Sequence, residues 1–194
     1  MTLAPGPAAA AGLGAGSVLF LTTWGVLAAA GAVAPAEPTR GSRRFWLTVL
    51  ALLALSAVEE VVFRGAVLGW GQRLLGTPAA LALSSVGFAA SHAFPTRLTI
   101  TTWINLTLYG VLFGLAYLAG GLPASIALHG SWNAWEWGSG FAVSGPTTTR
   151  MLPAPPARRL MPRVPYGPEG HWAATVCCLA ATAAMLAAAP PLGR

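Results

Sequence analysis

The sequence has no lysine, no aspartate and few charged residues of any kind. All eleven basic residues are arginine and all five acidic residues are glutamate, so charged residues make up 8% of the 194 residues and hydrophobic residues 55%. The mean hydropathy is +0.64. Because soluble domains carry about 25% charged residues, this composition indicates a membrane protein with several spans. The arginine-only, alanine-rich composition suggests a bacterial source with GC-rich DNA, and therefore the inner membrane.

Cysteine is almost absent as well, and the two that occur, Cys177 and Cys178, are adjacent in the last apolar segment. Neighbours on a helix point about 100° apart, so this pair suits neither a disulfide nor a metal site. No basic stretch interleaved with aromatic residues is present, so nucleic acid is not an expected partner. The first apolar stretch is not preceded by a charged N-terminal region and is long enough to span a membrane, which argues against a cleavable signal peptide.

Apolar segments of about 20 residues, the length of a spanning helix, recur along the chain. They are separated by proline and glycine, which end or restart helices. The pattern predicts an all-α polytopic membrane bundle of about six transmembrane helices, forming one domain over residues 1–194. The predicted spans are Ala10 to Val33, Phe45 to Trp70, Pro78 to Phe94, Leu98 to Leu118, Pro123 to Val143 and Trp172 to Ala189.

The long break between the last two spans, residues 144–170, is rich in Pro, Gly, Thr and Arg. We expect a solvated surface loop without helix; the alternative is a loop that folds over the mouth of a site.

The distribution of arginines predicts the orientation of the protein in the membrane. Eight arginines fall in the first, third and fifth loops (34–44, 95–97 and 144–170) and two on the opposite side, so these loops are predicted to be cytoplasmic.

Three polar groups interrupt the apolar segments: Glu59-Glu60-x-x-x-Arg64, Phe88-x-x-x-His92 and His129-x-x-x-Asn133. Residues four apart lie one turn apart on the same helix face. A charge at the centre of a membrane helix costs about 2.5 to 3.5 kcal/mol and usually marks a functional site. We therefore expect each of these segments to present a polar edge to a common site.

The two neighbouring glutamates are expected to play different parts. Glu60 precedes Arg64 by four residues, the favourable orientation for an ion pair, so we assign Glu60 and Arg64 a supporting role. Glu59 points about 100° away from that pair. A carboxyl group held in apolar surroundings without a cation suits a general base that activates water.

The other polar residues supply complementary chemistry. His92 either bonds a neighbouring helix or orients the attacking water with Glu59. His129 and Asn133 share a face, and their N–H donors suit a developing oxyanion. Glu136 lies near the same face, but Trp132 and its neighbours Trp135 and Trp137 suggest an interfacial aromatic belt, so we interpret Glu136 as structural.

In this order, the three motifs resemble those of the CAAX protease and bacteriocin-processing family, which includes type II CAAX prenyl endopeptidases and myxosortase-like sorting proteases. The resemblance extends from Ser56 to Trp137. It implies an intramembrane endopeptidase with four catalytic residues: Glu59, His92, His129 and Asn133. The implied substrate is a peptide or protein with a hydrophobic or lipidated segment, met in membrane lipid, such as a prenylated C-terminal motif, a leader peptide or a C-terminal sorting signal.

Two alternatives remain open at this stage. Glu59, His92 and His129 are a sufficient ligand set for a catalytic zinc, although no His-Glu-x-x-His helix is present; we favour a peptidase without metal or other cofactor. The second alternative is a non-enzymatic immunity or scaffold protein of the same family, whose polar residues only lock the bundle together.

Overall fold

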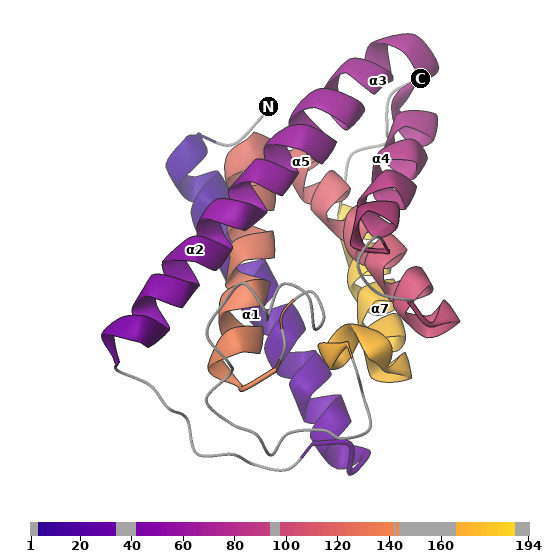
Figure 1. Cartoon of the computed structure of the whole chain (residues 1–194). Helices are drawn as coiled ribbons and strands as arrows, with labels where there is room; N and C mark the ends of the chain where they lie inside the picture. Colours follow the sequence, from indigo (N-terminus) through magenta and orange to yellow (C-terminus); the bar gives the residue numbers. More distant parts are fainter. Residues whose placement is uncertain (1–3, 34–41, 94–97, 142, 144–165, 189–194) are drawn as a thin grey trace.

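The computed structural model describes residues 4–33, 42–93, 98–141, 143 and 166–188. This part of the chain is helical and contains no strand, as the all-α prediction requires. In chain order, the elements are α1 (Pro5–Ala29), α2 (Arg43–Glu60), the π-helix η1 (Val61–Leu68), α3 (Gly69–Leu75), α4 (Thr77–His92), α5 (Ile100–Gly138), the 3₁₀-helix η2 (Gly167–Gly170) and α7 (Trp172–Ala188). Figure 1 shows α2, η1 and α3 as one continuous rod.

Each of the six predicted apolar segments coincides with a helix. Three continuous helices are long and apolar enough to cross a membrane: Pro5–Ala29, Arg43–Leu75 and Ile100–Gly138. The last of these bends at Gly121, whose backbone is left-handed (φ 69°), two residues before Pro123, so the fourth and fifth predicted spans form its two arms. The remaining helices are shorter, with 16 residues in α4 and 17 in α7. The described residues thus form a polytopic membrane bundle.

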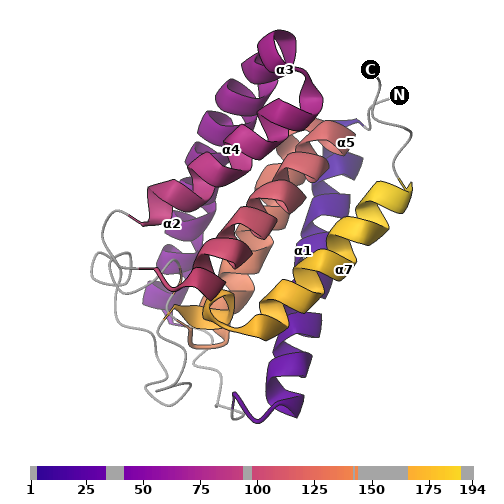
Figure 2. The same cartoon turned by 90° about the vertical axis from the view of Figure 1, so that its right-hand side faces the viewer.

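Helix α5 lies at the centre of the bundle, in contact with α1, α2, α4 and α7. Figures 1 and 2 show these helices arranged around it, with the start of α1 and the end of α7 at the same end of the bundle. Close approach of α1 depends on Gly12 and Gly16, one turn apart: a Cβ at either position would overlap the backbone of α5. Small residues at this spacing permit tight helix packing in membranes.

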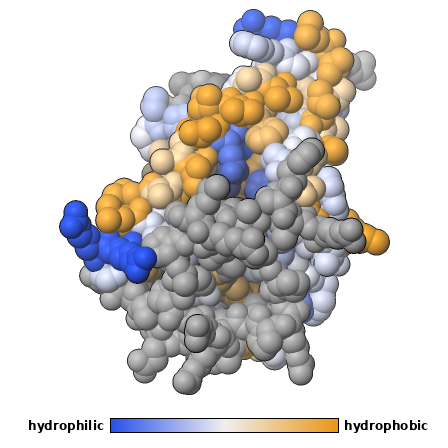
Figure 3. All heavy atoms as spheres, in the orientation of Figure 1, coloured by the Kyte–Doolittle hydropathy of each residue, from blue (hydrophilic) through white to orange (hydrophobic). Residues whose placement is uncertain are grey.

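The outward surface of the α2 rod is strongly apolar. Trp46, Leu50 and Val58 are each more than half exposed, and the apolar residues form a broad band across the face shown in Figure 3, with a hydrophilic strip within it. Such a large apolar surface is unfavourable in contact with water, whereas it packs readily against the apolar chains of lipids. We infer that this face of the bundle contacts lipid.

The loops used to predict orientation lie largely outside the described residues. This is the case for residues 34–41 of the first loop, for all of 95–97 and for 144–165 of the longest. The cytoplasmic placement of these loops stays a prediction.

Candidate active site

A charged network joins the rod of α2, η1 and α3 to the second arm of α5, which follows the bend at Gly121. Oε1 of Glu60 accepts hydrogen bonds from Nη1 of Arg64 at 3.0 Å and from Nδ1 of His129 at 2.9 Å. All three side chains are buried. The second guanidinium nitrogen of Arg64 donates to the carbonyl of Gly110 at 2.9 Å, and the guanidinium carbon lies 4.7 Å from the ring centre of Phe88. The expected pairing of Glu60 with Arg64 is present, and Glu60 also holds His129.

The π-helix explains how Arg64 enters the core. Val61–Leu68 is wound as a π-helix that begins directly after Glu60 and contains Arg64. π-helical turns inside α-helices are rare and frequently occur at functional sites. Because the winding is wider than that of an α-helix, residues after Glu60 are rotated relative to those before it, and Arg64 reaches Gly110 of α5 while it keeps its contact with Glu60.

The contact with Glu60 fixes the protonation of one nitrogen of His129. A carboxylate can only accept a hydrogen bond, so Nδ1 of His129 carries the hydrogen. Its other nitrogen, Nε2, lies 3.8 Å from Oε2 of Glu59, beyond hydrogen-bond distance. Nε2 therefore has a lone pair in the neutral imidazole and becomes a donor only in the imidazolium form.

Glu59 is held differently from its neighbour. Its side chain is 33% exposed, compared with 0% for Glu60. Oε2 of Glu59 is buried and has no hydrogen-bond partner among the described residues. This carboxyl group thus has one face toward His129 and another accessible from outside.

His92 is oriented by a bond within its own helix, and Asn133 by a bond from α5 to α2. Nδ1 of His92 lies 2.9 Å from the carbonyl of Phe88; because a carbonyl only accepts, Nδ1 carries the hydrogen and Nε2 has the lone pair. Nδ2 of Asn133 donates to Oγ of Ser56 at 2.9 Å. The Ser56 hydroxyl donates its hydrogen to the carbonyl of Leu52, so toward Asn133 it can only accept a hydrogen bond. This fixes the orientation of the Asn133 amide.

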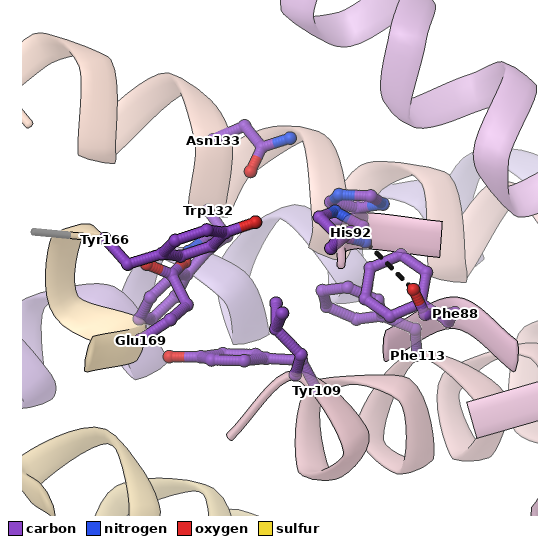
Figure 4. A pocket seen from close by; sticks show the side chains of 10 residues that line it. Phe88, His92, Tyr109, Phe113, Trp132, Asn133, Tyr166 and Glu169 are labelled. Atoms are coloured by element: carbon purple, nitrogen blue, oxygen red, sulfur yellow. Dashed lines mark hydrogen bonds between the residues drawn. The ribbon is translucent and has the colours of Figure 1, made fainter. Parts of the chain in front are cut away.

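One pocket brings most of these side chains together. His92, His129 and Asn133 line it, with Phe88 and Phe113. In Figure 4, His92, Phe88 and Phe113 lie on one side of the pocket and Asn133 at its upper edge. Glu59 is not a lining residue but lies next to His129 and acts electrostatically on His92. The structure therefore gathers the four expected catalytic residues, while no three His, Cys, Asp or Glu side chains of the described ranges are arranged to hold a metal ion.

Residues 41–135 match the family model described as Type II CAAX prenyl endopeptidase Rce1-like. This match, over 95 of the 194 residues, supports the CAAX protease and bacteriocin-processing family that the three motifs resemble. No curated protein and no solved structure matches the chain. The matched segment contains all six of the residues assigned catalytic or supporting roles. The chain therefore combines a membrane bundle with a match to a peptidase family.

The wall of the pocket opposite His92 is formed in part by a segment that the sequence analysis did not single out. Tyr166 and Glu169, at the start of and within η2, line the pocket together with Tyr109 and Trp132. Nε1 of Trp132 donates to Oε1 of Glu169 at 2.8 Å, and Nδ2 of Asn105 donates to the carbonyl of Glu169 at 2.7 Å. Figure 4 shows Tyr166, Trp132 and Glu169 across the pocket from His92.

Two predictions about this region are wrong. Residues 166–170, the end of the expected solvated loop, are helical in part, and Tyr166 and Glu169 are only 4% and 5% exposed. The expected interfacial belt is also absent at Trp132 and Trp137, each 2% exposed, because both indoles pack inside the bundle. Residues 144–165 of the same loop lie outside the described residues.

Burial changes the ionisation of this wall. It raises the pKa of the Glu169 carboxyl to about 7, and it raises that of the Tyr166 hydroxyl well above its usual range. Glu136, completely buried, lies close enough to Glu169 for the two carboxyl groups to influence each other. The wall therefore holds a pair of carboxyl groups in an apolar environment.

Proposed function

We propose that this protein is an intramembrane endopeptidase that uses Glu59 to activate water. In the proposed reaction, Glu59 accepts a proton from water as the water oxygen attacks the peptide carbonyl carbon. The lone pair on Nε2 of His92 orients the water. When the tetrahedral intermediate collapses and the C–N bond breaks, the proton passes from Glu59 to the leaving nitrogen.

The developing oxyanion is assigned to Asn133 and His129. One N–H of the Asn133 amide bonds Ser56, which leaves its second N–H for the pocket. His129 supplies an Nε2–H donor only as an imidazolium, since Nδ1–H is committed to Glu60. The observation that carries the proposal is the arrangement of these groups: His92, His129 and Asn133 line one pocket, and Glu59, whose Oε2 has no hydrogen-bond partner among the described residues, lies next to His129.

The substrate class follows from the surroundings. The pocket opens within an apolar bundle, and the matched family model is described as a prenyl endopeptidase. We infer a substrate peptide with a hydrophobic or lipidated segment that reaches the site from the membrane. Prenylated C-terminal motifs, leader peptides and myxosortase-type C-terminal sorting signals are the three candidates.

The proposal is tested with purified protein in liposomes. One peptide of each candidate type is added, and the products are identified by mass spectrometry. We expect cleavage of at least one peptide, with activity retained in strong chelator, because Glu59 polarises water without a Lewis acid. Chelator-sensitive activity that returns with zinc would instead favour Glu59, His92 and His129 as metal ligands. Cleavage of none of the peptides would argue against the endopeptidase.

A second prediction concerns the oxyanion donors. His129→Ala and Asn133→Ala should each lower kcat by about 100- to 1000-fold, with little change in substrate binding, because both donors act on charge that develops only during the reaction. Steady-state kinetics measures this. Ser131→Ala is the matched control: it lies on the same helix, and among the described residues its hydroxyl bonds the carbonyl of Leu128 alone. An effect on binding alone would make this face a recognition surface.

A further inference from the structure

The acidic residues of the chain are concentrated at one place. Of its five glutamates, four lie at or beside the pocket, in two pairs: Glu59 and Glu60 on one side, Glu136 and Glu169 on the other. Three of the four are no more than 5% exposed. In a chain with a net charge of +6, four of the five carboxyl side chains are thus concentrated around one pocket.

The two pairs differ in their cationic partners. Glu60 contacts both Arg64 and His129. Glu136 and Glu169 make no ion pair among the described residues, and both carboxyl oxygens of Glu136 and Oε2 of Glu169 have no hydrogen-bond partner there. Buried carboxyl groups without a partner are costly. Two neighbouring carboxyl groups repel each other when both are ionised, so a cation beside them would be favourable.

The same wall has the aromatic composition of a cation-binding site. Tyr109, Trp132 and Tyr166 line the pocket next to Glu169. The hydroxyl groups of Tyr109 and Tyr166 are buried and have no hydrogen-bond partner among the described residues. Aromatic faces attract ammonium and guanidinium groups, more strongly when water is excluded. The wall thus presents a carboxyl group, aromatic ring faces and hydroxyl oxygens that have no hydrogen-bond partner among the described residues.

We propose that this acidic aromatic wall, in which Glu169, Tyr109, Trp132 and Tyr166 line the pocket and the buried Glu136 lies close to Glu169, binds a lysine or arginine side chain of the substrate peptide. The inference rests on the proposed function, because it places the basic side chain beside the peptide bond that His129 and Asn133 hold. A bound cation supplies the partner that the described residues do not give to Glu136 and Glu169.

The test uses the peptide that the protein cleaves in liposomes. Each position around the cleaved bond is changed in turn to lysine, arginine, norleucine or glutamate, and kcat/KM is measured for each peptide. We expect one position at which lysine or arginine raises kcat/KM at least about tenfold over norleucine, the size of one or more charge-assisted hydrogen bonds. Glu169→Gln should lower the ratio of kcat/KM between the lysine and norleucine peptides to about one.

Two controls make the result decisive. Glu37→Gln, at the fifth glutamate, changes the net charge equally and should keep the preference. Tyr166→Phe keeps the ring and should weaken the preference in part, which provides a second variant if Glu169→Gln does not fold. A wild-type protein that cleaves lysine and norleucine peptides equally at every position would overturn the inference but leave the proposed endopeptidase intact. Absence of cleavage of any peptide would instead count against the endopeptidase.

Discussion

Glu59→Gln is expected to lower turnover by about 100- to 10,000-fold, the range that a general base contributes, without unfolding the protein. The amide has the shape of the carboxyl group but cannot take a proton from water. Stability should change little, because Oε2 of Glu59 has no hydrogen-bond partner among the described residues and the side chain is 33% exposed. Peptide cleavage in liposomes and thermal melting in detergent measure the two effects.

Glu59→Asp is the matched control for this variant. It keeps a carboxyl group but withdraws it by one methylene, so it should retain part of the activity and show that charge at this position matters. Full turnover by Glu59→Gln would exclude Glu59 as the base and leave His92, whose Nε2 has a lone pair, as the group that activates water.

The helices and the pairs within them could be predicted from sequence because their causes are local. Apolar runs broken by proline and glycine gave the six helical segments, and the spacing of Glu60 and Arg64 gave their contact. The bend at Gly121 also follows from the sequence, since Gly120-Gly121 and Pro123 separate two predicted spans. Each of these features depends on residues a few positions apart.

The remaining features of the site depend on contacts between distant segments. The bond between Glu60 and His129 joins residues 69 apart, and the one between Asn133 and Ser56 joins residues 77 apart. No local pattern marks Val61–Leu68 as a π-helix. Glu169 belongs to a segment of loop-like composition, and only its bonds with Trp132 and Asn105 of α5 hold it at the pocket. The wall opposite His92 could therefore not be inferred before the helices were packed.

The division of work between the two glutamates leads to the prediction with the largest effect on stability. Glu60→Gln removes the only carboxylate that bonds the guanidinium of Arg64 among the described residues, and Arg64 is completely buried. Breaking a buried ion pair by removing one partner costs about 3 to 5 kcal/mol, because an unmatched charge is left inside the protein. We expect a large fall in melting temperature in detergent.

The double variant Glu60→Gln with Arg64→Met separates stability from chemistry. It leaves no charge of the pair in the core, and replacing a buried ion pair by uncharged residues is often neutral for stability, so the melting temperature should return most of the way to the wild-type value. Activity should stay low, because the glutamine oxygen still accepts the Nδ1–H of His129 but cannot balance an imidazolium, the only form in which Nε2 donates. Recovery of turnover together with stability would show that His129 acts without the charge of Glu60, and that the network serves packing alone.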